Sequence, residues 1–259
     1  LGVGNCTDAI YIALKALDIG HGDEVITVSN TAVPTVTAIV NSGAKPKFVD
    51  VNEDYLINCK KIESAINKKT KAIIPVHLYG QTCDMSEILR IKKKYNLKII
   101  EDCAQSTGSM YKKKKSGSFG DVGCFSFYPT KILGAYGDAG FLTTDNTKLY
   151  NKMKRIRLMG METNIKSKNK FKKKYYAIEH GTNSRLDEVQ ASILNVKLNF
   201  IKNYINRRRE IAKIYSENLK NTELLLPKET NYNFHVFYQY VVRHSSRNRI
   251  IKSLIKKNI

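Results

Sequence analysis

Lys131 is the residue of this sequence best placed to act as a nucleophile. It follows the segment FSFYPT at residues 125–130 and precedes a glycine-rich loop at residues 134–140, away from the runs of lysine. A lysine amine becomes nucleophilic when partial burial leaves some of it uncharged at neutral pH. Since most lysines of a protein face solvent, the alternative is an ordinary surface lysine.

A second polar group stands where a predicted strand ends. Asp102 follows the apolar segment at residues 97–101, and Gln105 comes three residues later. A carboxylate in this position can pair with the protonated ring nitrogen of a cofactor. A glutamine on the same side of a helical turn can reach a neighbouring ring oxygen. The alternative, favoured for a lone aspartate at a strand end, is that Asp102 caps the next segment.

A third group, GVGNCTD at residues 2–8, precedes a predicted helix with Asp8 as its cap candidate. Glycines let the backbone approach an anion closely, and the start of a helix offers free N–H groups to a phosphate. Every helix needs a cap, so this group alone is weak evidence for a phosphate site.

All three groups lie at the ends of elements that alternate between strand and helix. Short apolar segments predict strands at residues 24–28, 46–51, 72–77, 97–101, 122–127 and 141–144. Apolar residues at helical spacing predict helices at residues 9–17, 35–41, 59–67, 85–95 and 149–158. This alternation is typical of the α/β class, with a mostly parallel sheet flanked by helices. Ligands of such sheets bind at the carboxyl ends of the strands.

The pattern changes after residue 145. We expect one long helix over residues 186–219, a strand at residues 236–242 and a helix at residues 247–257. The predicted domains are a large one at residues 1–205 and the start of a smaller α+β domain at residues 206–259. We expect the large domain to lack an N-terminal segment and the smaller one to be incomplete.

The formal net charge is +21, and runs of lysine at residues 112–115 and 166–174 supply much of it. Such runs can bind nucleic acid or attract an anionic sugar nucleotide. They contain little arginine and no interleaved aromatic residues, which favours solvated loops. No apolar run approaches the roughly 18 residues of a membrane span, and the five cysteines lack a regular spacing. We therefore expect reduced thiols in a cytoplasmic protein, with neither nucleic acid nor membrane as its partner.

Seven motifs, in order along the chain, together resemble the DegT/DnrJ/StrS family of sugar aminotransferases. They are GNCTDA (4–9), VDV (49–51), PVHLYG (75–80), EDCAQSTG (101–108), FSFYPTK (125–131), GDAG (137–140) and NSRLDEVQAS (183–192). The resemblance implies the aspartate-aminotransferase-like fold of type I pyridoxal-phosphate (PLP) enzymes. It also implies PLP as cofactor.

The resemblance assigns roles to individual residues. Lys131 matches the catalytic lysine that bonds to PLP, and Asp102 matches the acid that pairs with the pyridine nitrogen. Gln105 matches the partner of the ring hydroxyl. The remaining matches concern the cofactor phosphate: Ser126, Thr7 and Asp8 from the same chain, and Asn183, which crosses to the partner subunit. The last match implies a homodimer with shared active sites.

The same resemblance implies a reaction. L-glutamate gives its amino group to a nucleotide-linked keto-deoxysugar and leaves as 2-oxoglutarate. The loop LGAYGDAG at residues 133–140 resembles members that aminate C3 of a dTDP-3-keto-6-deoxyhexose, which gives a dTDP-3-amino-3,6-dideoxyhexose. The alternative is amination at C4 of a UDP- or dTDP-4-keto sugar. An alternative of another class is a basic regulatory or nucleic-acid-binding protein without catalysis.

Two departures from the family pattern concern the cofactor's surroundings. Cys6 replaces a common glycine, and Ala32 stands where many members place an aromatic ring. His77 is a candidate for covering the cofactor face in its place, and the alternative is that a histidine at a strand end is structural. The family's commonest use in bacteria is the assembly of surface polysaccharides, which we expect here too.

Overall fold

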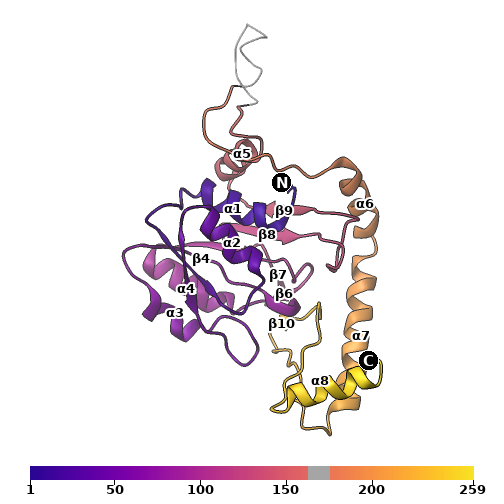
Figure 1. The fold of residues 1–259 in the computed structure, drawn as a ribbon. Coiled ribbons are helices and arrows are strands. Elements are labelled where there is room, and N and C mark those ends of the chain that lie inside the picture. Colours follow the sequence, from indigo (N-terminus) through magenta and orange to yellow (C-terminus); the bar gives the residue numbers. More distant parts are fainter. Residues whose placement is uncertain (163–175) are drawn as a thin grey trace.

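The computed structural model describes residues 1–162 and 176–259, and a seven-stranded sheet forms its centre (Figure 1). The strand order is β1-β9-β8-β5-β4-β2-β3. Five neighbouring strands, β8, β5, β4, β2 and β3, run parallel, while β9 is antiparallel to both β8 and β1. Their bounds are β1 Gly2–Val3, β2 Glu24–Val28, β3 Lys45–Val49, β4 Thr70–Ile73, β5 Lys98–Asp102, β8 Val122–Ser126 and β9 Gly140–Thr143.

Helices cover both faces of this sheet because the strand side chains alternate between two apolar clusters. Val25 of β2 packs in one cluster and Ile26 in the other. The first cluster includes residues of α1 (Cys6–Ala16), α2 (Val33–Asn41) and α5 (Thr147–Ile156), and the second includes residues of α3 (Cys59–Ala65) and α4 (Met85–Tyr95). The α/β class predicted from the alternation of elements is therefore confirmed.

The N-cap of helix α1 lies three residues before the predicted cap. The side-chain oxygen of Asn5 accepts a hydrogen bond from the N–H of Asp8 at 2.8 Å, so Asn5 is the N-cap and Asp8 lies in the first turn. The prediction of Asp8 as the cap was wrong. Sequence alone does not distinguish two cap-forming residues three positions apart, because either one can precede an apolar helix face.

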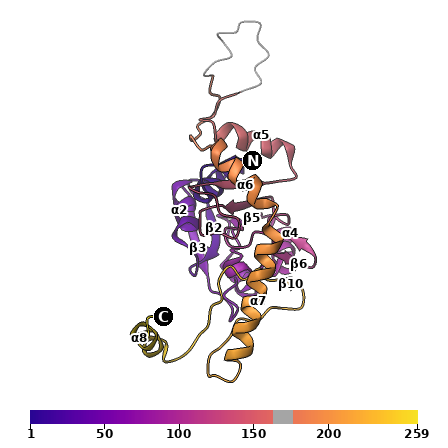
Figure 2. The ribbon, with the colours of Figure 1, turned by 90° about the vertical axis from the view of Figure 1, so that its right-hand side faces the viewer.

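The predicted single helix at residues 186–219 is two helices, α6 (Glu188–Leu198) and α7 (Ile201–Leu219), which follow one another down one side of the molecule (Figures 1 and 2). They serve different cores: Leu194 of α6 packs near the glycine-rich loop, whereas Ile205 of α7 packs against Ile132 and Val236. The break at residues 199–200 lets each apolar face meet its own cluster. The predicted domain boundary, residue 205, falls inside α7.

The predicted strand at residues 236–242 is also wrong. Only β10 (Asn233–Phe234) pairs there, with β6 (Met110–Tyr111), and β6 in turn pairs with β7 (Lys114–Lys115). The chain then leaves the extended conformation, because Phe237 has a φ of 45°. Residues 236–239 instead hydrogen-bond to the 3₁₀ turn η1 (Leu78–Gly80). The final helix, α8 (Arg247–Lys256), matches its prediction.

The lysine run at residues 112–115 is exposed: Lys112 and Lys113 form the turn between β6 and β7, and Lys114 and Lys115 form β7 itself. The run at residues 166–174 lies outside the described residues. In the described part of the chain, no helix has the length and apolar character needed to cross a membrane.

Candidate active site

The carboxyl end of β5, the turn after β8 and the start of α1 meet at one edge of the sheet. Gly140 of β9 lets the start of α1 approach the sheet closely. A Cβ atom at this position would lie 2.4 Å from the carbonyl carbon of Asn5 and 2.9 Å from the nitrogen of Cys6. The first turn of α1 therefore rests directly on the sheet, beside the strand ends that carry the candidate residues.

Asp102 is the last residue of β5 and is buried, with 4% of its surface exposed. One carboxylate oxygen, Oδ2, accepts a hydrogen bond from Thr35 Oγ1 at 2.7 Å, and Oδ1 accepts one from the N–H of Ala104 at 3.1 Å. The second contact is the capping role that the sequence also allowed. Because each carboxylate oxygen can accept two hydrogen bonds, acceptor capacity is left for a further donor.

Lys131 lies in the turn that follows β8, where its N–H donates to the carbonyl of Tyr128 at 2.8 Å. The side chain is half-buried, and its Nζ lies over the ring of Tyr238, 4.7 Å from the centroid. It pairs with no carboxylate of residues 1–162 or 176–259. The amine is thus partly shielded from water and free of a competing anion.

Asp102 and Lys131 stand at the same edge of the sheet. Asp102 ends β5, which pairs in parallel with β8, and Lys131 lies in the turn that follows β8. The thiol of Cys6, in the first turn of α1, is buried, and burial raises its pKa well above the usual value. The charges of Asp102 and Cys124 raise that pKa further, and the charge of Lys131 lowers it.

Gln105 and Ser126 each keep a donor that has no partner among residues 1–162 and 176–259. The N–H of Tyr79 donates to Gln105 Oε1 at 2.8 Å, so the amide NH₂ is the group left for a ligand. Ser126, the last residue of β8, is buried, and its Oγ accepts the N–H of Tyr128 at 3.4 Å. Its hydroxyl proton remains available for an anion.

The start of α1 is organised by Ser184, a residue that the sequence did not single out. The N–H of Gly4 donates to Ser184 Oγ at 2.9 Å, and Ser184 Oγ donates to Asp8 Oδ2 at 2.6 Å. Asn5 Nδ2 also donates to Asp8 Oδ2, at 3.2 Å. The Asp8 carboxylate therefore fastens this turn. The N–H groups of Cys6 and Thr7 precede the first helical hydrogen bond and point out of the helix start.

Asn183 directly precedes Ser184, and the two residues face different surroundings. Ser184 is buried, whereas Asn183 is exposed. The backbone here bridges to Leu158, and the N–H of Ser184 donates to the carbonyl of Arg157 at 2.9 Å. Asn183 is therefore held at the surface, next to the start of α1.

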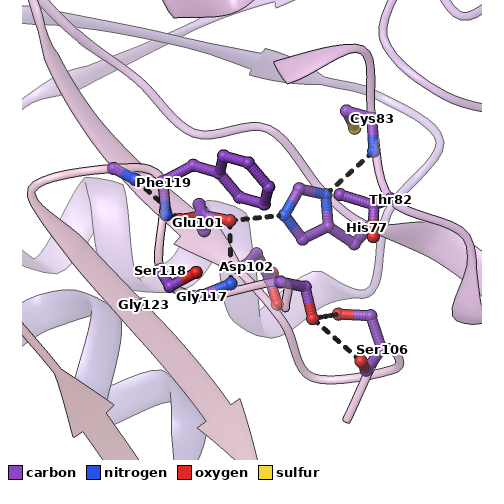
Figure 3. A network of polar contacts seen from close by, with 12 residues as sticks. His77, Thr82, Cys83, Glu101, Asp102, Ser106, Gly117, Ser118, Phe119 and Gly123 are labelled. Carbon is purple, nitrogen blue, oxygen red and sulfur yellow. Dashed lines mark hydrogen bonds and ion pairs between the residues drawn. The ribbon is translucent and has the colours of Figure 1, made fainter. Parts of the chain in front are cut away.

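His77 does not cover a cofactor, and that expectation was wrong. Its side chain is fully buried, and its Nδ1 accepts the N–H of Cys83 at 3.2 Å, so Nε2 carries the proton and donates to Glu101 Oε2 at 3.0 Å (Figure 3). Glu101 Oε2 also accepts from Gly117, and its Oε1 accepts from Phe119 and Gly120. This set of contacts, which we call the Glu101 network, lies beside Asp102 and ties β5 to the turn before β8.

The donor set fits PLP. The start of α1 and the Ser126 hydroxyl offer uncharged donors to a phosphate, Asp102 offers a buried carboxylate to a protonated ring nitrogen, and Lys131 offers an unpaired amine to an aldehyde. Cys6 is buried next to these residues, and Ala32 is exposed. Neither side chain is aromatic, so neither provides a ring to cover the face of the cofactor.

Sequence comparison finds the same group of enzymes. The profile of the DegT/DnrJ/EryC1/StrS aminotransferase family matches residues 1–259. A dTDP-3-amino-3,4,6-trideoxy-alpha-D-glucose transaminase of Micromonospora megalomicea is 46% identical over 98% of this chain and 67% of its own length. A dTDP-3-amino-3,6-dideoxy-alpha-D-galactopyranose transaminase of Aneurinibacillus thermoaerophilus is 46% identical over 100% of this chain and 69% of its own.

Solved structures agree. DesV of S. venezuelae, crystallised with a ketimine intermediate, superposes with a TM-score of 0.91 at 34% identity, over 99% of this chain and 67% of that one. A putative sugar aminotransferase of Streptococcus pneumoniae, solved in its PLP form, gives a TM-score of 0.89 at 26% identity, over 100% and 70%.

Proposed function

Because this chain belongs to the DegT/DnrJ/EryC1/StrS aminotransferase family, we propose that it transfers the amino group of L-glutamate to C3 of a dTDP-3-keto-6-deoxyhexose. The chain is a PLP-dependent sugar aminotransferase. The observation that carries the proposed site is geometric: Asp102 ends β5 beside the parallel strand β8, and Lys131 stands in the turn that follows β8 with its Nζ over the ring of Tyr238. The choice of C3 is supported by the two relatives at 46% identity, both named as transaminases of 3-amino sugars.

PLP would be held at four points of this chain. Lys131 would bond to its aldehyde carbon, and the carboxylate of Asp102 would accept a hydrogen bond from its protonated ring nitrogen. The NH₂ of Gln105 would donate to its ring oxygen. The phosphate would receive the N–H groups of Cys6 and Thr7, with the Ser126 hydroxyl as a further donor, while Asp8 holds the turn in shape. When bound, PLP supplies a carbonyl for exchange with amines and a ring that accepts electrons from the substrate carbon.

The protein's own part is to place a proton donor and acceptor next to the substrate. Lys131 Nζ, once free, takes the proton from the α-carbon of glutamate and later delivers a proton to the sugar carbon, which is general acid–base catalysis by a positioned amine. Its half-buried position limits competition from water. The buried carboxylate of Asp102 keeps the ring nitrogen cationic.

We propose a homodimer in which Asn183 of each subunit reaches the cofactor phosphate of the other. Its exposed side chain, on a backbone fixed by Ser184, supports this arrangement. The five cysteines are free, which supports a reducing cytoplasm as the compartment.

The proposed reaction is tested by supplying the chain with L-glutamate, PLP and either a dTDP-3-keto or a dTDP-4-keto 6-deoxyhexose. Formation of 2-oxoglutarate and a 3-amino sugar from the first substrate supports the proposal. Amination of the 4-keto sugar alone would overturn the choice of C3. We expect Lys131→Ala to lower turnover by at least about a thousandfold, since the group that is proposed to move the proton is lost.

A further inference from the structure

The ring of Tyr238 is the one group of the C-terminal part of the described chain that contacts Lys131 Nζ. The centroid lies 4.7 Å from the nitrogen, within the range of a cation–π contact. The Tyr238 hydroxyl lies 3.5 Å from Thr130 Oγ1, so this tyrosine touches two consecutive residues of the turn. Residue 238 lies more than a hundred positions from the lysine in the sequence, and its segment was predicted as a strand.

Tyr238 is held in this place by contacts on both sides of its backbone. Gly80, with a φ of 102°, lies so close that a Cβ atom there would be 2.9 Å from the nitrogen of Tyr238. The N–H of Gln239 donates to the carbonyl of Tyr79 at 3.4 Å. From the other side, Arg208 Nη1 of α7 donates to the carbonyl of Tyr238 at 3.1 Å. The backbone at Tyr238 is therefore held between η1 and α7.

We propose that Tyr238 is a positioning residue that receives the Lys131 amine whenever the amine is not bonded to the cofactor. This inference rests on the proposed role of Lys131. The face of an aromatic ring attracts an ammonium group without forming a salt bridge that would retain it. The ammonium group that forms when Lys131 has taken the α-carbon proton would be held there without a salt bridge and could still deliver the proton, whereas a carboxylate in the same place would bind it more tightly. The ring, not its hydroxyl, supplies this contact.

The test compares Tyr238→Phe, which keeps the ring, with Tyr238→Leu and Tyr238→Met, which remove it. Tyr240→Leu is the matched control, because Tyr240 lies two residues away and its hydroxyl contacts Ser216 at 2.9 Å. Three quantities are measured on the full chain: the rate at which the apo chain bonds to PLP, followed by absorbance; the rate of the glutamate half-reaction; and the isotope effect of glutamate deuterated at its α-carbon. Thermal unfolding midpoints show that each variant is folded.

We expect Tyr238→Phe and Tyr240→Leu to stay within about twofold of the parent in the PLP-bonding rate, the half-reaction rate and the isotope effect. Variants without the ring should lose about tenfold in the half-reaction with KM little changed, a ratio that fits one cation–π contact. They should also bond PLP more slowly and show a larger isotope effect. Parent-like rates in both folded ring-less variants would overturn the inference, as would an equal loss in Tyr238→Phe. Failure of the parent chain to bond PLP would instead overturn the proposed function.

Discussion

At the scale of single residues, the candidate site depends on a carboxylate that stays buried without a cationic partner in the described chain. Thr35 Oγ1 and the N–H of Ala104 are its hydrogen-bond donors, and both are uncharged. Uncharged donors offset part of the cost of burial and leave the negative charge uncompensated. A cation that enters the site therefore gains from this charge, as the protonated ring nitrogen of PLP would.

We expect Asp102→Asn to bind PLP on Lys131 and yet to turn over at least about a hundredfold more slowly. The amide of asparagine has the shape of the carboxylate and keeps the contact with Thr35. It carries no charge, however, so it no longer holds the ring nitrogen protonated, and electrostatic stabilisation is usually the largest contribution to catalysis. Single-turnover absorbance with glutamate measures this directly. Asp121→Asn is a control carboxylate next to the same strand, whose Oδ2 accepts the N–H of Ile99 at 2.8 Å. An unimpaired Asp102→Asn would contradict the assignment.

Ser184 offers a second test at this scale. Its hydroxyl joins the N–H of Gly4 to the carboxylate of Asp8. We expect Ser184→Ala to raise the dissociation constant of PLP by about five- to tenfold, because one hydrogen-bonding group at the start of α1 is lost. Ser192→Ala removes a hydroxyl that contacts only the α6 backbone and should have no effect. Titration of the apo chain with PLP gives both constants, and equal affinity in the two variants would refute the role of Ser184.

At the scale of elements, the Glu101 network fastens the strand that carries Asp102. Burial alone would raise the pKa of Glu101. The hydrogen bond from His77, with those from the N–H groups of Gly120 and Gly117, outweighs that effect and lowers the pKa of Glu101 below its ordinary value of 4.5. A carboxyl group with a lowered pKa stabilises the folded state fully above its unfolded pKa, and loses this contribution as the pH falls through the folded one.

The free energy of unfolding should therefore decrease as the pH falls below about 4.5, the ordinary carboxyl value that Glu101 has when unfolded. Glu101→Gln should lower stability at pH 7 by about 3 kcal/mol, since an amide NH₂ would face N–H donors in a buried site. Its pH dependence in this range should be flatter than that of the parent. Urea unfolding at pH 7 to pH 3 measures both effects, and parallel curves for parent and variant would contradict this account.

The elements near the site also show what sequence patterns can and cannot predict. The strand at residues 24–28 and the helix at residues 85–95 coincide with β2 and α4, because period and caps are local properties. The start of α1 and the division between α6 and α7 were not predicted, because they depend on tertiary contacts of these helices. The segment at residues 236–242 has an apolar pattern suited to a strand, but its backbone packs closely against Gly80 and leaves the extended conformation. Lys131, Asp102 and Gln105 were found through their motifs, and Ser184 lies inside the motif NSRLDEVQAS, where it was assigned no role. Tyr238 and Thr35 were not found, because only the fold brings them close.

At the scale of the whole molecule, the proposed dimer places parts of one site on two subunits. Mixing tests this arrangement. Lys131→Ala and Asn183→Ala should each be weakly active alone. A mixed dimer would contain one complete site, built from Lys131 of one subunit and Asn183 of its partner.

After subunit exchange we expect such a mixture to recover about a quarter of parent activity, because about half of the dimers are mixed and each has one complete site of two. A mixture of Lys131→Ala with Asp102→Asn is the control. The same subunit contributes Lys131 and Asp102 to a site, so each site of a mixed dimer still lacks one of the two residues. Recovery equal to that of the control would show that Asn183 acts within its own subunit.

The central claim is that Lys131 is the amine that bonds to PLP. Reduction of the PLP-loaded chain with borohydride, followed by proteolysis and mass spectrometry, tests it most directly. The account predicts loss of the cofactor's absorbance and one phosphopyridoxyl adduct, on the peptide that contains Lys131. An adduct on a different lysine, or an unmodified Lys131 in chain that has bound PLP, would contradict it.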